Sequence, residues 1–335
     1  MTSLSRIGLG VIPALCIFAI GLAGCKASGK EAPAAASQPP FMSAVASTPP
    51  QSADDAPPPE KTGGFDGKRA FAQVAKQVSF GPRPSGSPAI AQLQEYLLSE
   101  LKSYGCAVET DSFGSDTPAG RIAMKNILVK IPGEKPGIIL LGTHYDTKRL
   151  ANFVGADDSG SSTGVMLELA RLLCPQHGKY AVWIAFFDGE EAVNPAWQDP
   201  DNRYGSRQMA AKFAVAGDIP KIKAFLLADI VGGRNLHFKR EGDSTKWLKD
   251  LVWKTAHQLG YQSVFLDTEF PVSDDHLSFL SRNVPSVDVI DLDNGPNGDV
   301  YYWHTPQDTL DKISAKSLAI TGHVFLESVK QLQAK

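Results

Sequence analysis

The sequence has no long run of Lys and Arg, and its 33 basic residues are balanced by 36 acidic ones to give a net charge of -3. A nucleic-acid-binding surface needs clustered cations that displace counterions from phosphates. We therefore expect no nucleic-acid partner. The chain also lacks an internal repeat of fixed period, so a solenoid or propeller is not expected.

Cysteine is scarce, with four residues in the whole chain. Two of them, Cys16 and Cys25, lie near the N-terminus, which leaves Cys106 and Cys174 in the rest of the protein. These two residues can pair in an oxidising compartment or remain buried thiols, and the sequence allows both outcomes. No Cys and His pair suited to a cysteine hydrolase is evident, and a serine hydrolase is disfavoured as well.

The first 25 residues have almost no charge. Arg6 is followed by an apolar stretch from Ile7 to Ala23 and by Leu22-Ala23-Gly24-Cys25. This pattern predicts a secretion signal over residues 1–25 that ends in a lipobox, with Cys25 acylated. The alternative is an N-terminal membrane helix that stays attached. Either reading predicts an exported protein, and the lipobox predicts a bacterial lipoprotein that is anchored in a membrane and faces the periplasm or the cell exterior.

Residues 26–64 contain few large apolar side chains and are rich in Ala, Pro and Ser. Such a segment buries too little surface to offset its chain entropy, so we expect a disordered tether. The remaining chain, residues 65–335, is long enough for one large domain with a substantial core. We expect this domain to be a monomer.

Within residues 65–335, helical and strand-like patterns alternate. The residues 137–142 form a uniformly apolar run that is typical of a central strand covered on both faces. Strands separated by helices imply right-handed crossovers. We therefore predict an α/β fold with a single domain, in which a mostly parallel, twisted central β-sheet has helices on both faces.

Carboxylates and imidazoles follow several of the predicted strands. Glu190 and Glu191 come directly after the apolar run that ends in Phe186-Phe187-Asp188-Gly189. The carboxyl ends of parallel strands meet at one edge of a sheet, so distant residues of this kind are expected to converge there. Zn²⁺ accepts such nitrogen and oxygen ligands. The other candidates are His144, Asp146, Asp157, Asp158, Asp229, Asp274 and His304.

The motifs, taken in order from the Pro84-Ser85-Gly86-Ser87-Pro88 loop to the last helix, resemble the zinc-dependent exopeptidase family that contains both di-zinc aminopeptidases and glutaminyl cyclases. The resemblance implies that Asp158, Glu191 and His304 are zinc ligands. Three protein ligands leave one position of a catalytic zinc open for water or a substrate carbonyl. Glu190 lies next to a ligand in the sequence, which makes it the candidate proton shuttle.

The two branches of this family differ in what they imply for the other acidic residues. In an aminopeptidase, His144 and Asp229 complete a second zinc site and Asp158 bridges the two metals. In a glutaminyl cyclase one zinc is used, and Asp229 and Asp274 are the carboxylates that adjoin Glu190. In both branches Asp146 orients His144.

Several motifs favour the cyclase branch, among them His144-Tyr145-Asp146-Thr147-Lys148 and Asp274-Asp275-His276. By contrast, Gly155-Ala156-Asp157-Asp158 resembles the aminopeptidase form. The cyclase reading implies that Trp197 and Trp303 wall a narrow pocket for a glutamine side chain, and that Lys148 contacts the substrate.

We therefore expect a zinc-dependent enzyme that converts N-terminal glutaminyl residues of peptides to pyroglutamate with release of ammonia. Its substrates are peptides with a free N-terminus. The alternative is an aminopeptidase that removes N-terminal residues with two zinc ions. A metal-binding lipoprotein without activity is less favoured, because the proton shuttle Glu190 and the three ligands are all present.

Overall fold

The computed structural model describes residues 56–292 and 302–335. The predicted secretion signal, the acylation of Cys25 and most of the predicted tether lie outside the described residues and stay predictions. Among the described residues, none of the helices combines the length and the apolar character needed to cross a membrane.

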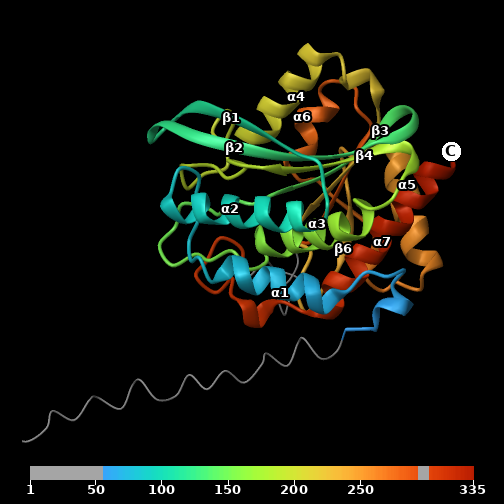
Figure 1. The fold of residues 1–335 in the computed structure, drawn as a ribbon. Helices are drawn as coiled ribbons and strands as arrows, with labels where there is room; N and C mark the ends of the chain where they lie inside the picture. The colour runs from blue at the N-terminus through green and yellow to red at the C-terminus, as the bar shows by residue number, and fades with distance from the viewer. Residues whose placement is uncertain (1–55, 293–301) are drawn as a thin grey trace, which may run out of the picture. The chain divides into compact units, whose positions relative to one another are not determined.

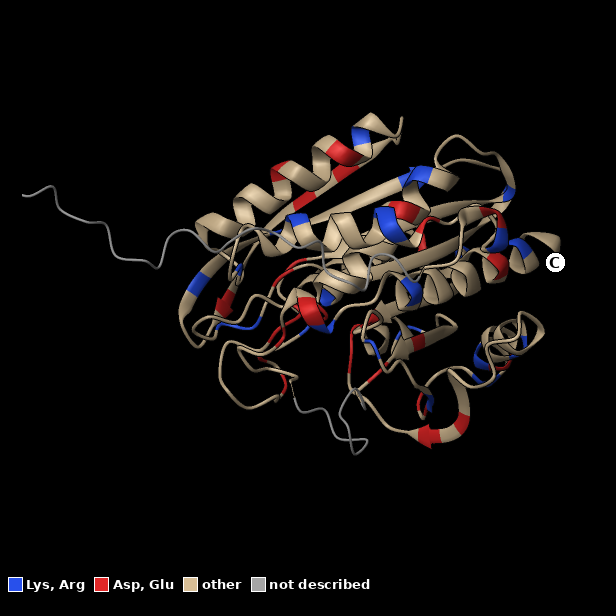
Figure 2. Ribbon diagram, turned by 90° about the horizontal axis from the view of Figure 1, so that it is seen from below, with Lys and Arg blue, Asp and Glu red and all other residues tan. Residues whose placement is uncertain are grey.

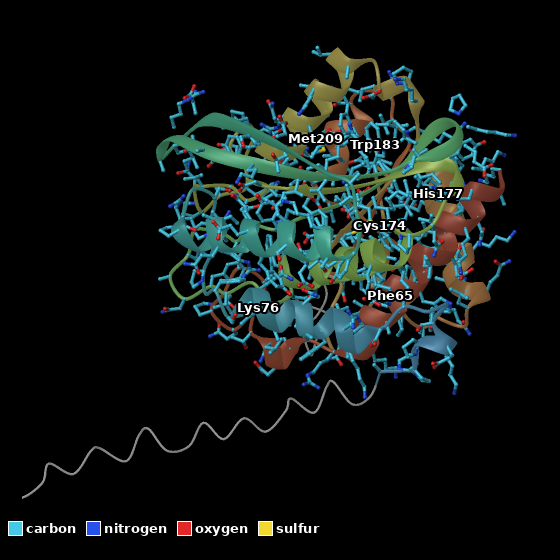
Figure 3. All side chains as sticks on the ribbon, viewed as in Figure 1. Phe65, Lys76, Cys174, His177, Trp183 and Met209 are labelled. Carbon is cyan, nitrogen blue, oxygen red and sulfur yellow. A yellow bond between two sulfur atoms is a disulfide. The ribbon has the colours of Figure 1, made fainter. Side chains whose placement is uncertain are left out.

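The described residues begin at residue 56, before residue 65, where we predict the domain to start. A 3-10 helix, η2 (Pro59–Lys61), is followed by Thr62, which is buried and donates a hydrogen bond to the carbonyl of Phe65 at 2.6 Å. Phe65, labelled in Figure 3, is fully buried. Its ring lies where a side chain at Gly322 would be, so this aromatic residue holds the entering segment against the last helix.

A six-stranded sheet forms the centre of the fold, with the strand order β1-β2-β4-β3-β5-β8. The strands β4, β3, β5 and β8 run parallel to one another, whereas β2 pairs antiparallel with both β1 and β4. The bounds are β1 (Val108–Thr117), β2 (Gly120–Ile131), β3 (Gly133–His144), β4 (Gly178–Phe187), β5 (Ile222–Asp229) and β8 (Ser286–Ile290).

The mostly parallel α/β sheet is confirmed, but the antiparallel hairpin at its edge was not predicted. β1 reads Val-Glu-Thr-Asp-Ser-Phe-Gly-Ser-Asp-Thr and has no buried residue. A half-exposed edge strand of this composition lacks the apolar run by which the buried strands were recognised. This segment is a strand because ten consecutive residues pair with β2, and not because of its own apolar content.

Helices cover both faces of the sheet (Figure 1). On one face, α4 and α6 pack through Met209, Phe213 and Phe279 against Phe187 and Phe225. On the other face lies the larger apolar core, to which the remaining α-helices contribute. The bounds are α1 (Gly67–Val78), α2 (Pro88–Ser103), α3 (Gly160–Leu173), α4 (Tyr204–Ala216), α5 (Lys246–Gln258), α6 (His276–Leu280) and α7 (Ala315–Ala334).

The short strands β6 (Phe238–Glu241) and β7 (Phe265–Phe270) form a separate two-stranded parallel sheet. Two other 3-10 helices, η3 (Ile219–Lys221) and η4 (Leu310–Lys312), precede β5 and α7. Several helices begin at a side-chain cap: Asp66, Ser87 and Ser314 each accept hydrogen bonds from backbone N–H groups of the first turn.

Candidate metal centre

The sheet register brings the ends of four strands together at one edge. His144, the last residue of β3, pairs with Phe187, the last residue of β4. Asp229 ends the neighbouring strand β5 and pairs with Ile290 at the end of β8. Parallel strands therefore deliver their loops to the same place, as the sequence predicted. Acidic residues, red in Figure 2, occur in loops as well as on helices of this fold.

Within residues 56–292 and 302–335, two groups of side chains have ligand atoms close enough to hold one metal ion, and the first consists of Asp158, Glu191 and His304. His304 Nε2 lies 3.3 Å from Asp158 Oδ2 and 3.2 Å from Glu191 Oε1. Zinc bonds of about 2.0–2.1 Å at tetrahedral angles separate neighbouring ligand atoms by roughly 3.3–3.4 Å. The two measured separations match this spacing.

The hydrogen bonding of Glu191 also fits a metal. Both carboxylate oxygens of this side chain are buried, and neither accepts a hydrogen bond within the described residues. A buried carboxylate without hydrogen-bond partners is costly unless a cation compensates its charge. The nearest cations are the His304 imidazole and the ammonium of Lys148, whose Nζ lies 3.5 Å from Glu191 Oε2. The residues present therefore fit a zinc ion.

A second group consists of His144, Asp158 and Asp229. His144 Nε2 lies 3.0 Å from Asp229 Oδ1 and 3.2 Å from Asp158 Oδ1. Asp158 thus belongs to both groups, as a bridging carboxylate would. The other nitrogen of His144 lies 3.5 Å from Asp146 Oδ1, and the carboxylate of Asp146 accepts the backbone N–H groups of Glu190 and Glu191.

Glu190 is placed beside these groups without joining either of them. Its carboxylate lies 3.8 Å from His144 Nδ1 and lines the same cavity as Asp158 and His304. Burial raises the pKa of Glu190 well above its usual value, and the charges of Asp274 and Glu191 add to this, although His144 opposes it. Burial likewise raises the pKa of Asp229 to about 7, despite the lowering effect of His144.

For the imidazole of His304, neighbouring charges together have a larger effect on the pKa than burial has. Burial lowers its pKa, but the carboxylates of Glu191 and Asp158 outweigh this and raise the pKa to about 9. In the absence of a metal these carboxylates favour a protonated imidazole. A bound cation would take over that role and keep the nitrogen free as a ligand.

A cavity of about 320 Å³ opens over the metal centre. Its lining includes Asp158, Glu190, Asp229, Asp274 and His304, together with Trp197 and Trp303. Trp303 is 38 % exposed and stacks on the His304 ring, with ring centroids 4.1 Å apart. Asp274 accepts the backbone N–H of Asp275 and is 2 % exposed. The geometry therefore gathers most of the expected site residues around one cavity.

The structure corrects the expectation for Lys148. Its side chain is 2 % exposed, it does not line the cavity, and its ammonium donates a hydrogen bond to the carbonyl of Ala192 at 2.9 Å. Because this ammonium also lies beside Glu191, it acts on a candidate metal ligand rather than on a substrate. Sequence position after His144 did not reveal which way the side chain turns.

Other residues of the site were not recognised from the sequence. An apolar part of the cavity wall comes from Phe270, Val272, Ile290 and Leu292. These side chains follow or end ordinary strands and carry no chemical signal that separates them from core residues. Asp308 follows the candidate ligand His304 in the run His304-Thr305-Pro306-Gln307-Asp308, and no sequence pattern assigned it a role.

One serine motif has the Gly-x-Ser-x-Gly spacing of a hydrolase nucleophile, Gly160-Ser161-Ser162-Thr163-Gly164. Ser162 is buried within α3, where its hydroxyl donates to the carbonyl of Ser159 and accepts from Thr143. It does not line the cavity over the metal centre. The motif is therefore part of the helix packing and not a nucleophile elbow.

Comparison with known proteins agrees with this site. Residues 126–329 match the model of peptidase family M28. The chain is 31 % identical over 286 residues to a glutaminyl-peptide cyclotransferase of Boiga irregularis, which covers 73 % of this chain and 76 % of that protein.

Solved structures show the same relationship. A glutaminyl cyclase from an Acidobacteriales bacterium superposes with a TM-score of 0.76 and 41 % identity, covering 81 % of this chain and 95 % of that one. A Zn-dependent exopeptidase from Parabacteroides distasonis gives a TM-score of 0.71 and 30 % identity, covering 78 % and 97 %. The chain belongs to peptidase family M28.

Proposed function

We propose that this protein is a zinc-dependent glutaminyl cyclase that converts N-terminal glutaminyl residues of peptides to pyroglutamyl residues and releases ammonia. The observation that carries the proposal is the carboxylate of Glu190, which belongs to neither candidate metal group and lines one cavity with two of the three candidate zinc ligands, Asp158 and His304, and with two tryptophans. The names of the relatives and the structural neighbours support the same activity.

Asp158, Glu191 and His304 would hold the zinc ion. When bound there, zinc supplies a Lewis acid that polarises the side-chain carbonyl of the substrate glutamine. Trp197 and Trp303 line the cavity that this side chain would occupy. Because the attacking amine and the carbonyl belong to one residue, the protein needs only to hold the side chain folded back towards its own N-terminus.

Glu190 is the proposed proton carrier. The α-amino nitrogen forms a bond to the side-chain carbonyl carbon, and the bond from that carbon to the amide nitrogen breaks. Glu190 accepts the proton that the amine loses and returns it to the departing nitrogen, which leaves as ammonia. Asp274 and Asp229 line the same cavity and restrict which carboxylates can be charged together.

An aminopeptidase remains the alternative, and one observation supports it. The second group, His144, Asp158 and Asp229, has the ligand spacing of a further metal site. With two zinc ions, the same Glu190 would take a proton from a water that attacks the peptide bond. The number of zinc ions and the preferred substrate therefore distinguish the two activities.

The proposal is tested by a paired assay on the purified, zinc-loaded protein. We expect ammonia and pyroglutamyl product from glutaminyl peptides, little cleavage of Leu- or Ala-naphthylamide, and close to one zinc per chain. Glu190→Gln keeps the shape of the side chain but removes the proton acceptor. It should lower kcat by about 10²- to 10⁴-fold while zinc stays bound.

Glu191→Gln is the matched control, because it alters the neighbouring carboxylate in the same way. This variant should lose zinc affinity together with activity, whereas Glu190→Gln loses activity alone. Rapid cleavage of the naphthylamides without ammonia release from glutaminyl peptides would assign the protein to the aminopeptidases. Full turnover after complete removal of metal by a chelator would reject both zinc mechanisms.

A further inference from the structure

The carboxylate of Asp308 connects two of the segments that supply candidate zinc ligands. Its Oδ1 accepts the backbone N–H of Asp157 at 2.8 Å, and its Oδ2 accepts that of Asp158 at 3.1 Å. Asp308 follows the ligand His304 by four residues in the chain and is fully buried. A single side chain thus ties the loop that carries His304 to the loop that carries Asp158.

Arg83 holds the same loop from its carbonyl side. Its guanidinium donates to the carbonyl of Val154 at 2.5 Å and to that of Gly155 at 2.9 Å. Arg83 is also fully buried, and its backbone N–H donates to the hydroxyl of Thr147 at 2.9 Å. The planar guanidinium therefore spans two successive carbonyls from a fixed base.

The loop between these two side chains is tightly folded. Gly155 has a φ of +51°, and a Cβ at this position would lie 2.0 Å from the carbonyl oxygen of Asp158. The chain therefore turns back on itself within four residues, with its N–H groups bonded to Asp308 and its carbonyls bonded to Arg83. This arrangement fixes the backbone on both sides of the shared metal ligand.

We propose that Asp308, opposed by Arg83, is a positioning residue that sets the carboxylate of Asp158 against the imidazole of His304 before the metal binds. Neither side chain is among the grouped ligand atoms or lines the cavity. Their effect is preorganisation, because a ligand that is already in place loses less conformational freedom when the ion arrives. The inference rests on the proposed zinc site, but not on which reaction that site catalyses.

Asp308→Asn in the full-length protein provides the test. Asparagine has the same shape, but it replaces one accepting oxygen with an NH₂ group that faces a backbone N–H. Loss of a side chain that orients a metal ligand typically weakens metal binding by about 10- to 100-fold. We expect this rise in the zinc dissociation constant, measured by competition with a chromogenic chelator, together with a smaller fall in the melting temperature of the zinc-free protein.

Glu241→Gln is the matched control for a general loss of stability. The buried carboxylate of Glu241 likewise accepts backbone N–H groups, from Asp243 at 2.9 Å, Ser244 at 2.7 Å and Val272 at 3.3 Å, but none of these donors belongs to a candidate metal ligand. We expect this variant to lower the melting temperature of the zinc-free protein and to leave the zinc dissociation constant within about two-fold of the wild-type value.

Arg83→Lys keeps the positive charge but cannot span two carbonyls, so it should weaken zinc binding in the same direction. The Arg83→Lys variant also provides the test if Asp308→Asn does not fold. Equal zinc affinity in the wild type and the folded Asp308→Asn or Arg83→Lys variant would overturn the inference, as would an equal loss in Glu241→Gln. A protein that binds zinc and responds as expected, yet turns over neither substrate class, would contradict the proposed function while leaving this inference intact.

Discussion

Glu190 and Glu191 are neighbours in the chain, yet the fold gives their carboxylates different surroundings. Glu191 points towards the His304 imidazole and the Lys148 ammonium, and its oxygens accept no hydrogen bond within the described residues. Glu190 lines the cavity and lies near His144. Consecutive side chains beyond the end of a strand can point to different sides, so one pair supplies both a candidate ligand and a candidate proton carrier.

The exposed tryptophan beside the metal centre yields a prediction at the same scale. Trp303 stacks on His304 and forms part of the cavity wall. We expect Trp303→Ala to raise KM for glutaminyl peptides by about 10-fold, since a lost aromatic wall costs on the order of 1.4 kcal/mol of substrate contact. Steady-state kinetics on protein of measured zinc content provide the test.

Trp247→Ala is the control for this substitution, because Trp247 is similarly exposed but lies on α5, where Lys335 covers its ring. It should leave KM unchanged, and Trp303→Phe should restore much of the loss. A KM that does not respond to Trp303→Ala would remove this residue from the substrate site.

At the scale of elements, two helices meet so closely that only glycine fits at their crossing. A Cβ at Gly67 of α1 would lie 2.2 Å from the carbonyl oxygen of Ala315 and 2.8 Å from the Cβ of Ala319, both on α7. We expect Gly67→Ala to lower the free energy of unfolding by about 1–3 kcal/mol, as overpacked contacts usually do. Urea denaturation measures this change.

Gly114→Ala is the matched control on β1, because the nearest atoms there belong to the flexible guanidinium of Arg121. It should change the free energy of unfolding by less than about 0.5 kcal/mol. If the two glycine variants were equally stable, the close approach of α1 and α7 would not limit the packing.

The elements themselves were predicted to very different extents from the sequence. The buried strands β3 and β4 were recognised, because the apolar content of a run reports burial directly. The edge strand β1 and the short strand β6 were not recognised, because neither carries a long apolar run. Their strand conformation comes from hydrogen bonds to a partner strand: β1 pairs with β2 in a hairpin, and β6 pairs with β7 in a separate sheet.

At the scale of the whole molecule, Cys106 and Cys174 form a disulfide, which resolves a pairing that the sequence left open. The bond joins the segment before β1 to the end of α3, across 68 residues of chain. Cys174 is labelled in Figure 3. A disulfide is stable in an oxidising compartment, and the export of the chain stays a prediction.

Closing a loop of this length should stabilise the fold by about 4 kcal/mol through the entropy of the unfolded chain. We therefore expect the Cys106→Ser/Cys174→Ser variant to unfold at a clearly lower urea concentration and to bind zinc as the wild type does. Treating the wild type with a phosphine reductant should produce the same shift. Identical unfolding curves for the oxidised and reduced protein would show that the link adds no stability.

The sequence by itself determined the fold class, because apolar periodicity is a local property of the chain, and its resemblance to the zinc-dependent exopeptidases supplied most of the candidate site residues. Only the tertiary structure decided which partners those side chains contact. It placed Lys148 against Glu191 instead of the cavity, set Asp158 between two imidazoles, and bonded Asp308 to the loop behind it. These outcomes depend on side-chain directions and on distances between loops from different strands, which no stretch of sequence specifies alone.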